Sequence, residues 1–283
     1  MFLDVRCSLF IKIIRVLMFK FISFGSGSSG NCYCLFTETD GLMIDAGLGI
    51  RTIKKYFYEY GFSFHMLHNI IVTHDHADHI KSVGTLSTTH DLPVYATAAV
   101  HQGIMRNYCV RNKIPENNKR IIEKNVPFHA GEFDITAFDV PHDSSDNVGY
   151  RIEYGGKVFC IITDAGHVTD EMADMIGNTD YLVLESNYDE DMLRDGPYPE
   201  YLKSRIRSGR GHLGNNECAA ALERYASGRL RHVWLCHLSE ENNHPEIVRK
   251  TVGQILDSPE TVNARHFEID ILKRKSPNGV FVL

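Results

Sequence analysis

The sequence predicts one α/β domain, because short apolar segments typical of strands alternate with amphipathic segments typical of helices along most of its length. The chain has 283 residues, of which 43% are hydrophobic, and this is enough to bury a large core. Several of the predicted strands end in a histidine or an aspartate. We expect these strand ends to meet at one edge of a sheet, so the same pattern predicts a functional site there.

The first elements form a predicted β-meander with a glycine-rich corner. Strands are expected at 18–24, 32–37 and 42–44, and the segment 25–31, Gly-Ser-Gly-Ser-Ser-Gly-Asn, is the corner between the first two. The backbone N–H groups of such a corner could cradle a phosphate. The lysine of a P-loop is missing, however, and a plain hairpin corner explains the segment at least as well.

Helical and strand patterns then alternate through the rest of the chain. A helix is expected at 50–60, where the helical spacing stops at Gly61, and a buried strand at 69–73. The Gly155-Gly156 pair predicts a hairpin turn between two later strands. The remaining elements are helices at 80–90, 97–109, near 169–176 and from Pro245, and strands at 93–96, 133–140, 148–154, 157–163, 181–184 and 233–236.

Residues 1–17 lie outside the predicted domain, which we expect to span 18–283. Their apolar stretch is interrupted by charges, has no export cleavage site and is too short to cross a bilayer. We expect a disordered extension or a mis-assigned start, with an amphipathic surface helix as the weaker alternative. The seven cysteines lack zinc-ribbon spacing, so we expect a cytoplasmic protein with reduced thiols, in which Cys32 and Cys34 pack as ordinary strand residues.

The charge balance argues against a broad basic face on this chain. The net charge is −6 and the pI is near 6.2, so any contact with nucleic acid has to be local. One segment is basic, and it either steers a phosphate or forms an ordinary solvated helix end: Lys203, Arg205, Arg207 and Arg210. Aromatic residues offer stacking surfaces for bases or pack in the core: Tyr188, Tyr198, Tyr201 and Trp234.

The most informative segment is His-Asp-His-Ala-Asp-His at 74–79, directly after the predicted strand at 69–73. It brings four potential metal ligands into one turn: His74, His76, Asp78 and His79. These side chains cannot share one helix face, but a tight loop can aim the first pair at one ion and the second pair at another. Three more candidates follow other apolar strands, namely His142, Asp164 and His237. The repeated pattern predicts a site for two metal ions.

These residues, in this order and preceded by Asp45, resemble the metallo-β-lactamase superfamily from about Phe19 to the C-terminus. The resemblance implies an αββα sandwich of two mixed β-sheets flanked by helices, with the metals at one edge. It also implies that His74, His76 and His142 hold one ion, that Asp78, His79 and His237 hold the other, and that Asp164 bridges them. The expected cofactors are two divalent ions, Mn²⁺ or Zn²⁺, and the oxygen bridge also tolerates Fe²⁺.

Four further segments resemble the YycJ/WalJ-like subgroup of this superfamily: 26–32, 141–143, 211–213 and 237–243. Gly214 stands where the subgroup usually has serine. Members of the subgroup are regarded as metal-dependent phosphodiesterases or DNA exonucleases. The resemblance therefore implies a hydrolase that uses a metal-bridging hydroxide as nucleophile, with DNA or another phosphodiester as its substrate and no membrane partner.

The same resemblance implies roles for individual residues. Asp78, Asp164 and His212 are expected to be catalytic, and His212 would bind a phosphate oxygen or protonate the leaving alkoxide. Asp45 is expected to orient the ligand loop, and Asp143 to hold His142 or a metal-bound water, although each could simply close a turn. Four residues are expected to contact the substrate, of which the first three could instead cap the helix near Pro245: Ser239, Asn242, Asn243 and Arg210.

Three other functions fit part of the pattern. Thioester or lactam hydrolysis predicts carbonyl substrates and no dependence on His212. A metal-binding protein without turnover predicts metal uptake and no hydrolysis. Oxygen reduction requires iron and a flavin partner, and His76 stands where that branch typically carries glutamate, which counts against it. The native metal and the oligomeric state are left open by the sequence.

Overall fold

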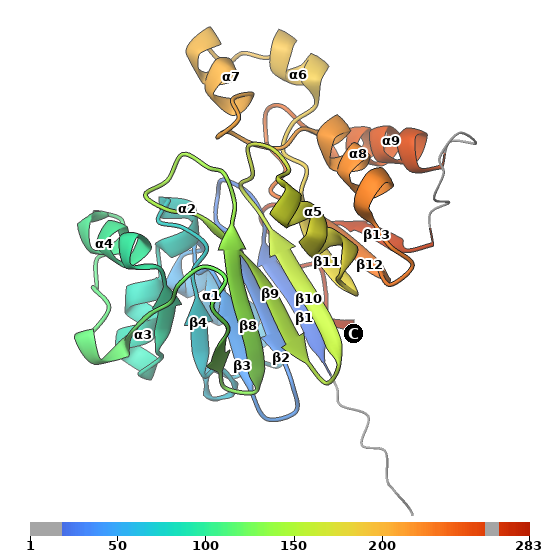
Figure 1. Ribbon diagram of the computed structural model, residues 1–283. Coiled ribbons are helices and arrows are strands. Elements are labelled where there is room, and N and C mark those ends of the chain that lie inside the picture. The colour runs from blue at the N-terminus through green and yellow to red at the C-terminus, as the bar shows by residue number, and fades with distance from the viewer. Residues whose placement is uncertain (1–18, 258–265) are drawn as a thin grey trace, which may run out of the picture.

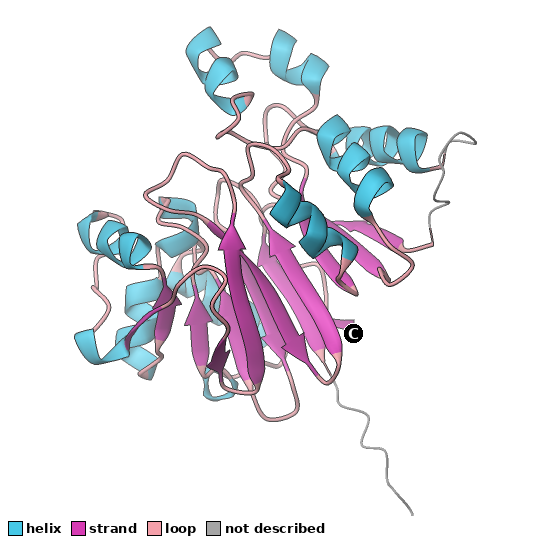
Figure 2. Cartoon of the chain, in the orientation of Figure 1, coloured by secondary structure: helices cyan, strands magenta, loops and turns pink. Residues whose placement is uncertain are grey.

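Two β-sheets packed face to face form the centre of the computed structural model, which describes residues 19–257 and 266–283 (Figure 1). The expectations for residues 1–17 concern a part of the chain outside these ranges. Helices lie on the outer face of each sheet, as Figure 2 shows. The predicted αββα sandwich of two mixed β-sheets is confirmed.

The first sheet has the strand order β14-β1-β2-β3-β4-β5-β6. Strands β1 to β3 pair antiparallel, whereas β3 to β6 pair parallel. Its strands are β1 (Lys20–Gly25), β2 (Cys32–Phe36), β3 (Gly41–Ile44), β4 (Asn69–Ile71), β5 (Val94–Ala96), β6 (Lys119–Ile121) and β14 (Phe281–Val282).

The second sheet mirrors this arrangement, with the order β13-β12-β11-β10-β9-β8-β7. Strands β7 to β10 pair antiparallel, and β10 to β13 pair parallel, so the carboxyl ends of β10, β11 and β12 reach the same edge. Its strands are β7 (Phe128–Ala130), β8 (Phe133–Asp139), β9 (Val148–Tyr154), β10 (Lys157–Ile162), β11 (Tyr181–Glu185), β12 (His232–Cys236) and β13 (Glu268–Ile271).

The helices form two outer layers and a separate cap. The first sheet is covered by α1 (Ile50–Glu59), α2 (Ala77–Ile80), α3 (Val83–His90) and α4 (Ala98–Arg106). The second is covered by α5 (Asp170–Gly177), α8 (Asn215–Tyr225) and α9 (Pro245–Leu256). Two short helices, α6 (Glu190–Asp195) and α7 (Glu200–Ile206), lie beyond the strand ends and form the cap (Figure 1). Short 3₁₀ turns occur at Phe64–Met66 and Glu116–Asn118.

Alternation along each strand divides the core into three layers. On β2, Tyr33 packs between the sheets while its neighbour Cys34 faces the helices, and on β10 the same holds for Phe159 and Cys160. Because both faces of these strands are buried, they appear in the sequence as continuous apolar runs. The alternation places Cys32 and Cys34 in the layer under the helices as free thiols, which confirms that they are ordinary strand residues.

The structure differs from the predicted elements where polar contacts override local periodicity. The helix expected at 80–90 is divided into α2 and α3, because the Ser82 hydroxyl donates to the Leu48 carbonyl at 2.6 Å and its N–H to the Ala46 carbonyl at 2.8 Å. The helix expected at 97–109 ends at Arg106, since Asn107 is extended and its side chain accepts from Cys109 N. Short polar elements such as β6, β7 and α6 were missed because they bury little apolar surface.

Membrane insertion and base stacking by the tryptophan find no support in the fold. No helix in the described part of the chain combines the length and the apolar character that a membrane span requires. Trp234 is fully buried between the sheets, with its ring 4.7 Å from that of Phe21. Core packing, rather than contact with a base, therefore accounts for Trp234.

Phe21→Ala tests the aromatic layer between the sheets. The Phe21 ring contacts those of Trp234, Phe159 and Tyr33, so the substitution leaves a cavity and should lower the free energy of unfolding by about 3–5 kcal/mol. Urea unfolding followed by tryptophan fluorescence measures this change. Tyr58→Ala is the control because that side chain is 87% exposed. Equal stability of the two variants would contradict the layered core.

Candidate metal centre

Strand ends from both sheets converge on one site. Asp45 follows β3, Asp164 follows β10 and His237 follows β12. These residues have positive φ angles of 56°, 53° and 54°, a left-handed conformation that costs non-glycine residues free energy. At each of these three residues the backbone changes direction, so the strand ends there and the side chain of the residue joins the site. Such strained residues are typical of functional sites, so the backbone itself supports the predicted location.

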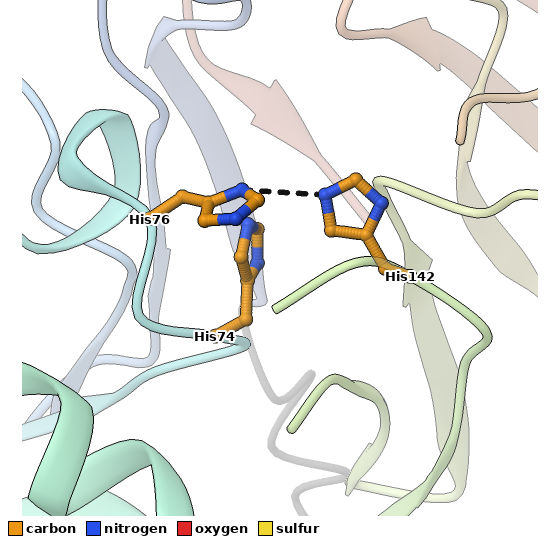
Figure 3. Close-up of side chains that lie close together, drawn as sticks. All are labelled: His74, His76 and His142. Carbon is orange, nitrogen blue, oxygen red and sulfur yellow. Dashed lines mark hydrogen bonds between the residues drawn. The ribbon is translucent and has the colours of Figure 1, made fainter. Parts of the chain in front are cut away.

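The ligand loop joins β4 to α2. His74 lies before the helix, His76 is its N-cap residue, and Asp78 and His79 lie in its single turn. His74 lies close to both His76 and His79, with its ring centroid 4.7 Å and 4.0 Å from theirs. Figure 3 shows His76, His74 and His142 gathered from two loops, and His76 Nδ1 is 3.3 Å from His142 Nε2. Potential ligand atoms of these three histidines lie within 4.8 Å of one another.

A second group lies beside the first. Asp78, His79 and His237 bring potential ligand atoms within 4.8 Å of one another. Asp164 lies between the two groups: its carboxylate is 3.2 Å from His79 Nε2 and 3.8 Å from His142 Nε2. All seven predicted metal ligands are thus brought together: His74, His76, Asp78, His79, His142, Asp164 and His237.

The donor atoms of this site fit divalent ions. Within the described residues, the buried Nε2 atoms of His74 and His237 have no hydrogen-bond partner, although buried polar atoms normally have one. The other ring nitrogen is held in each case, by Thr73 Oγ1 at 3.0 Å and by Glu185 Oε1 at 3.0 Å. A histidine fixed through Nδ1 with Nε2 left available is the usual arrangement of a metal ligand.

The charges in the cluster depend strongly on one another. Burial lowers the pKa of His237, but the carboxylates of Asp164, Asp78 and Glu185 raise it to about 10. Burial also opposes the charge on His79, whose pKa is nevertheless raised well above its ordinary value, first by Asp45 and then by Asp164. Several carboxylates therefore share a small buried volume, which favours cations at this site.

Asp164 and His74 shift in the directions that suit metal ligands. Burial raises the pKa of Asp164, yet His237 and His79 hold that pKa well below its usual range, so the carboxylate is ionised. Burial and the neighbouring His79 lower the pKa of His74 well below its ordinary value, so this imidazole is neutral. An ionised carboxylate and a neutral imidazole are the forms that coordinate metals.

Asp45 supports the ligand loop without reaching the first group of histidines. Its buried carboxylate accepts from Thr73 N at 2.8 Å, from Thr73 Oγ1 at 2.8 Å and from His79 Nδ1 at 2.7 Å. These contacts hold the start of the loop and the orientation of His79, as the expected orienting role requires.

Glu185 is a residue of the site that the sequence reasoning missed. Its fully buried carboxylate contacts His212 Nδ1 at 2.8 Å and His237 Nδ1 at 3.0 Å, and it accepts from Ala165 N and Leu213 N. Burial raises the pKa of Glu185, but His212 outweighs this effect and the pKa is lowered. Glu185 ends β11 just as Asp164 follows β10, so the pattern of polar residues at strand ends could have identified it.

The glycine-rich corner braces the metal centre. Ser26 Oγ accepts from His237 N at 2.9 Å, and Asn31 Nδ2 is 2.8 Å from His79 Nε2. Most backbone N–H groups of the corner already bond within the protein: those of Ser26, Gly27, Gly30 and Asn31. The corner therefore supports the ligands, and it is not the open cradle of N–H groups that a phosphate-binding loop presents.

The four cations of the basic segment have different environments. Lys203 is buried and donates to the Arg194 carbonyl at 2.6 Å, Arg205 pairs with Asp143, and Arg207 pairs with Glu190 at 3.2 Å. Burial raises the pKa of Asp143, but the Arg205 guanidinium outweighs this effect and lowers it. Arg210 donates to the His142 carbonyl at 3.2 Å and lines a hollow beside that ligand. Most of these cations thus have partners within the protein.

The segment after His237 lies at the site, but it does not cap α9. His244 is the N-cap residue of α9, which corrects the alternative in which Ser239, Asn242 or Asn243 has that role. Asn242 and Asn243 are buried, and Asn243 Nδ2 donates to the carbonyls of Ser186 and Asn187 at 2.9 Å. Ser239 lines a cavity together with His212.

Comparisons with known proteins identify the family of this chain. Residues 42–237 match the model of the beta-lactamase superfamily domain. Exodeoxyribonuclease YycJ of Bacillus anthracis is 33% identical over 255 residues, which cover 90% of this chain and 96% of the relative. Exodeoxyribonuclease WalJ of Streptococcus pneumoniae is 37% identical over 234 residues, which cover 83% of this chain and 87% of the relative.

Solved structures show the same fold at low sequence identity. The metallo-β-lactamase fold protein YhfI from Bacillus subtilis has a TM-score of 0.70 at 20% identity and covers 94% of this chain and 100% of its own. Unliganded yeast PDE1 has a TM-score of 0.70 at 11% identity, and the match covers 92% of this chain and 99% of the PDE1 chain. The chain therefore belongs to the metallo-β-lactamase superfamily and is a metal-dependent hydrolase. Within the superfamily it is a YycJ/WalJ-like protein.

Gly47→Ala should displace the ligand turn. A Cβ atom at Gly47 would lie 1.6 Å from the Asp78 carbonyl oxygen, so the backbone of the turn has to move. We expect divalent-ion affinity to fall at least tenfold, measured by calorimetric titration with Zn²⁺ and Mn²⁺. Gly49→Ala is the matched control, since nothing lies within 4 Å of its added Cβ. Equal affinity of both variants would show that the turn tolerates the shift.

Glu185→Gln tests the residue that the sequence reasoning missed. The amide keeps the shape of the side chain but removes the charge that orients His212 and His237. Changes at such supporting residues typically cost about 10–100-fold in metal affinity or activity, and we expect a loss in that range. The control is Glu240→Gln, whose carboxylate is 54% exposed on the surface. If Glu185→Gln kept wild-type metal affinity and activity, Glu185 would have no functional role in the site.

Proposed function

We propose that the chain is a DNA exonuclease that hydrolyses phosphodiester bonds with two divalent metal ions. The convergence of six candidate ligands on Asp164, with His212 beside them, carries the proposal. The names of two relatives, both exodeoxyribonucleases, support DNA as the substrate. The six described cysteines are free thiols, which suits the reducing cytoplasm that we propose as its location.

In this proposal, the two ligand groups hold one ion each. His74, His76 and His142 would hold the first ion, Asp78, His79 and His237 would hold the second, and Asp164, which lies between the two groups, would contribute to both. Bound divalent ions acidify water to supply a hydroxide nucleophile and neutralise charge on the phosphate. Mixed imidazole and carboxylate donors suit Mn²⁺ and Zn²⁺, and Fe²⁺ is also compatible.

His212 is the proposed proton donor to the leaving oxygen. Its Nδ1 contacts Glu185 Oε1 at 2.8 Å and lies 3.5 Å from Asp164 Oδ1, which fixes the ring beside the ligands. The ring also lines the adjacent cavity, so it is accessible to substrate as well as held by the protein. A histidine oriented by a buried carboxylate is a common general acid or base.

Asp78 and Asp164 would contribute to catalysis in this proposal as carboxylate ligands of the ions. Among the substrate-contact candidates, Ser239 and Arg210 line hollows on two sides of the site. Asn242 and Asn243 lie beneath that surface, and Asn242 N donates to Ser239 Oγ at 3.2 Å. We therefore propose that Asn242 acts by holding Ser239 in place, and that Asn243 supports the same region through the carbonyls of Ser186 and Asn187.

His212→Ala distinguishes phosphodiester cleavage from the other functions. Loss of the proton donor should lower kcat on linear DNA by about 10²–10⁴-fold while metal binding persists, because His212 is not among the proposed ligands. His76→Ala and Asp164→Ala should lose both metal and activity. The assay uses Mn²⁺-loaded protein with bis(p-nitrophenyl) phosphate, linear DNA, a thioester and a lactam. Preference for the thioester or the lactam, or metal uptake without any hydrolysis, would overturn the proposal.

A further inference from the structure

A cavity of about 180 Å³ lies between the cap and the metal centre. One wall comes from the cap, with Tyr198, Leu202 and Ile206. The opposite wall comes from loops at the strand ends, with Ser28, His212 and Ser239. His212 also lies 3.5 Å from Asp164, so the cavity opens directly beside the proposed reaction centre.

The chemistry of the walls favours an uncharged group with a flat face and polar edges. The cap wall is apolar and aromatic, whereas the loop wall carries hydroxyl and amide groups from Ser28, Ser239 and Asn187. The one arginine that lines the cavity, Arg205, already binds both carboxylate oxygens of Asp143. The positive charge of Arg205 is thereby neutralised, so a phosphate group would gain little electrostatic stabilisation inside the cavity. A nucleobase on its sugar has the required character.

The cap is held firmly over this cavity. Leu193 and Ile206 pack with Tyr188 in a small core of their own. Lys203 ties α7 to the end of α6 through the Arg194 carbonyl, and Arg205 ties α7 to the turn that carries His142. These contacts make the cap a fixed wall. A strand that enters from the metal centre therefore meets the cap wall.

We propose that this cavity binds the terminal nucleoside of a DNA strand, with its base stacked on Tyr198, and that the cap thereby confines cleavage to strand ends. The inference rests on the proposed nuclease function and adds the residue and the wall that select an end. The phosphate that joins the terminal nucleoside to the strand then lies beside the candidate metal ligands. Water adds to its phosphorus and the P–O bond to the rest of the strand breaks. The phosphate stays with the terminal nucleoside, the strand leaves with a hydroxyl protonated by His212, and one nucleotide is released.

Tyr198→Ala tests the stacking surface by its effect on DNA kinetics. Loss of stacking on one base should raise KM for linear single-stranded DNA about 5–160-fold more than KM for bis(p-nitrophenyl) phosphate, which has no base. Tyr198→Phe keeps an aromatic face and should restore KM to within about threefold. Tyr201→Ala is the matched control, because Tyr201 lies on the same cap but is 76% exposed and does not line the cavity.

A binding measurement tests the same contact without turnover. A DNA oligonucleotide with 2-aminopurine at its end, made resistant to cleavage by terminal phosphorothioates, is titrated with the Mn²⁺-loaded protein. Stacking on Tyr198 should quench the terminal fluorophore in the wild type and in Tyr201→Ala, but not in Tyr198→Ala. An internal 2-aminopurine should be quenched less. Both ends of the strand are labelled in turn, which also identifies the end that is bound.

The outcomes separate this inference from the function on which it rests. If the wild-type protein cleaves neither DNA nor the small diester, the proposed function fails. If it cleaves both, but cuts circular single-stranded DNA as fast as linear DNA, the confinement of cleavage to strand ends is wrong. If Tyr198→Ala leaves KM for DNA and the quenching unchanged, Tyr198 does not stack on the base and the cavity has another occupant.

Discussion

The buried carboxylate of Asp164 is the constraint on which the rest of the structure depends. A buried, ionised carboxylate has lost its contact with water and has to be stabilised by positive charge. Two groups of imidazoles surround the Asp164 carboxylate. Those imidazoles come from both sheets: His79 follows β4 in the first, and His142 and His237 follow β8 and β12 in the second. The sandwich has to close in the correct register for Asp164 to be satisfied, so fold and site specify each other.

Hydrogen bonds from residues behind the candidate ligands hold the ligand rings in the positions that this constraint requires. Asp45 holds His79, Glu185 holds His237, and the Gly211 carbonyl accepts from His142 Nδ1 at 2.9 Å. Each contact fixes one ring nitrogen and directs the other toward the cluster of candidate ligands. Glu185 also holds His212, so one buried carboxylate couples a metal ligand to the proposed proton donor. The strained left-handed strand ends make these short connections possible.

The cap gives this member of a versatile superfamily a boundary of its own. The sandwich and its metal centre fit many hydrolytic substrates, and function within a common fold depends on what surrounds the site. Here α6 and α7 add an aromatic wall beside His212, and an ion pair between Arg205 and Asp143 fastens that wall to the ligand turn. A separate small core stabilises the cap.

The sequence by itself predicted ten of the fourteen described strands and the seven candidate ligands, because strand periodicity and polar residues at strand ends are local features of the chain. It missed β6, β7, β13 and β14, which are short strands near the edges of the sheets. It did not identify Glu185, whose role depends on two histidines that are 27 and 52 residues away in the chain. It also suggested a cluster of four available cations, whereas three are engaged within the fold. Tertiary structure alone decided these points, since the pairing of charges and the walls of a cavity arise from segments that meet only when the two sheets and the cap pack together.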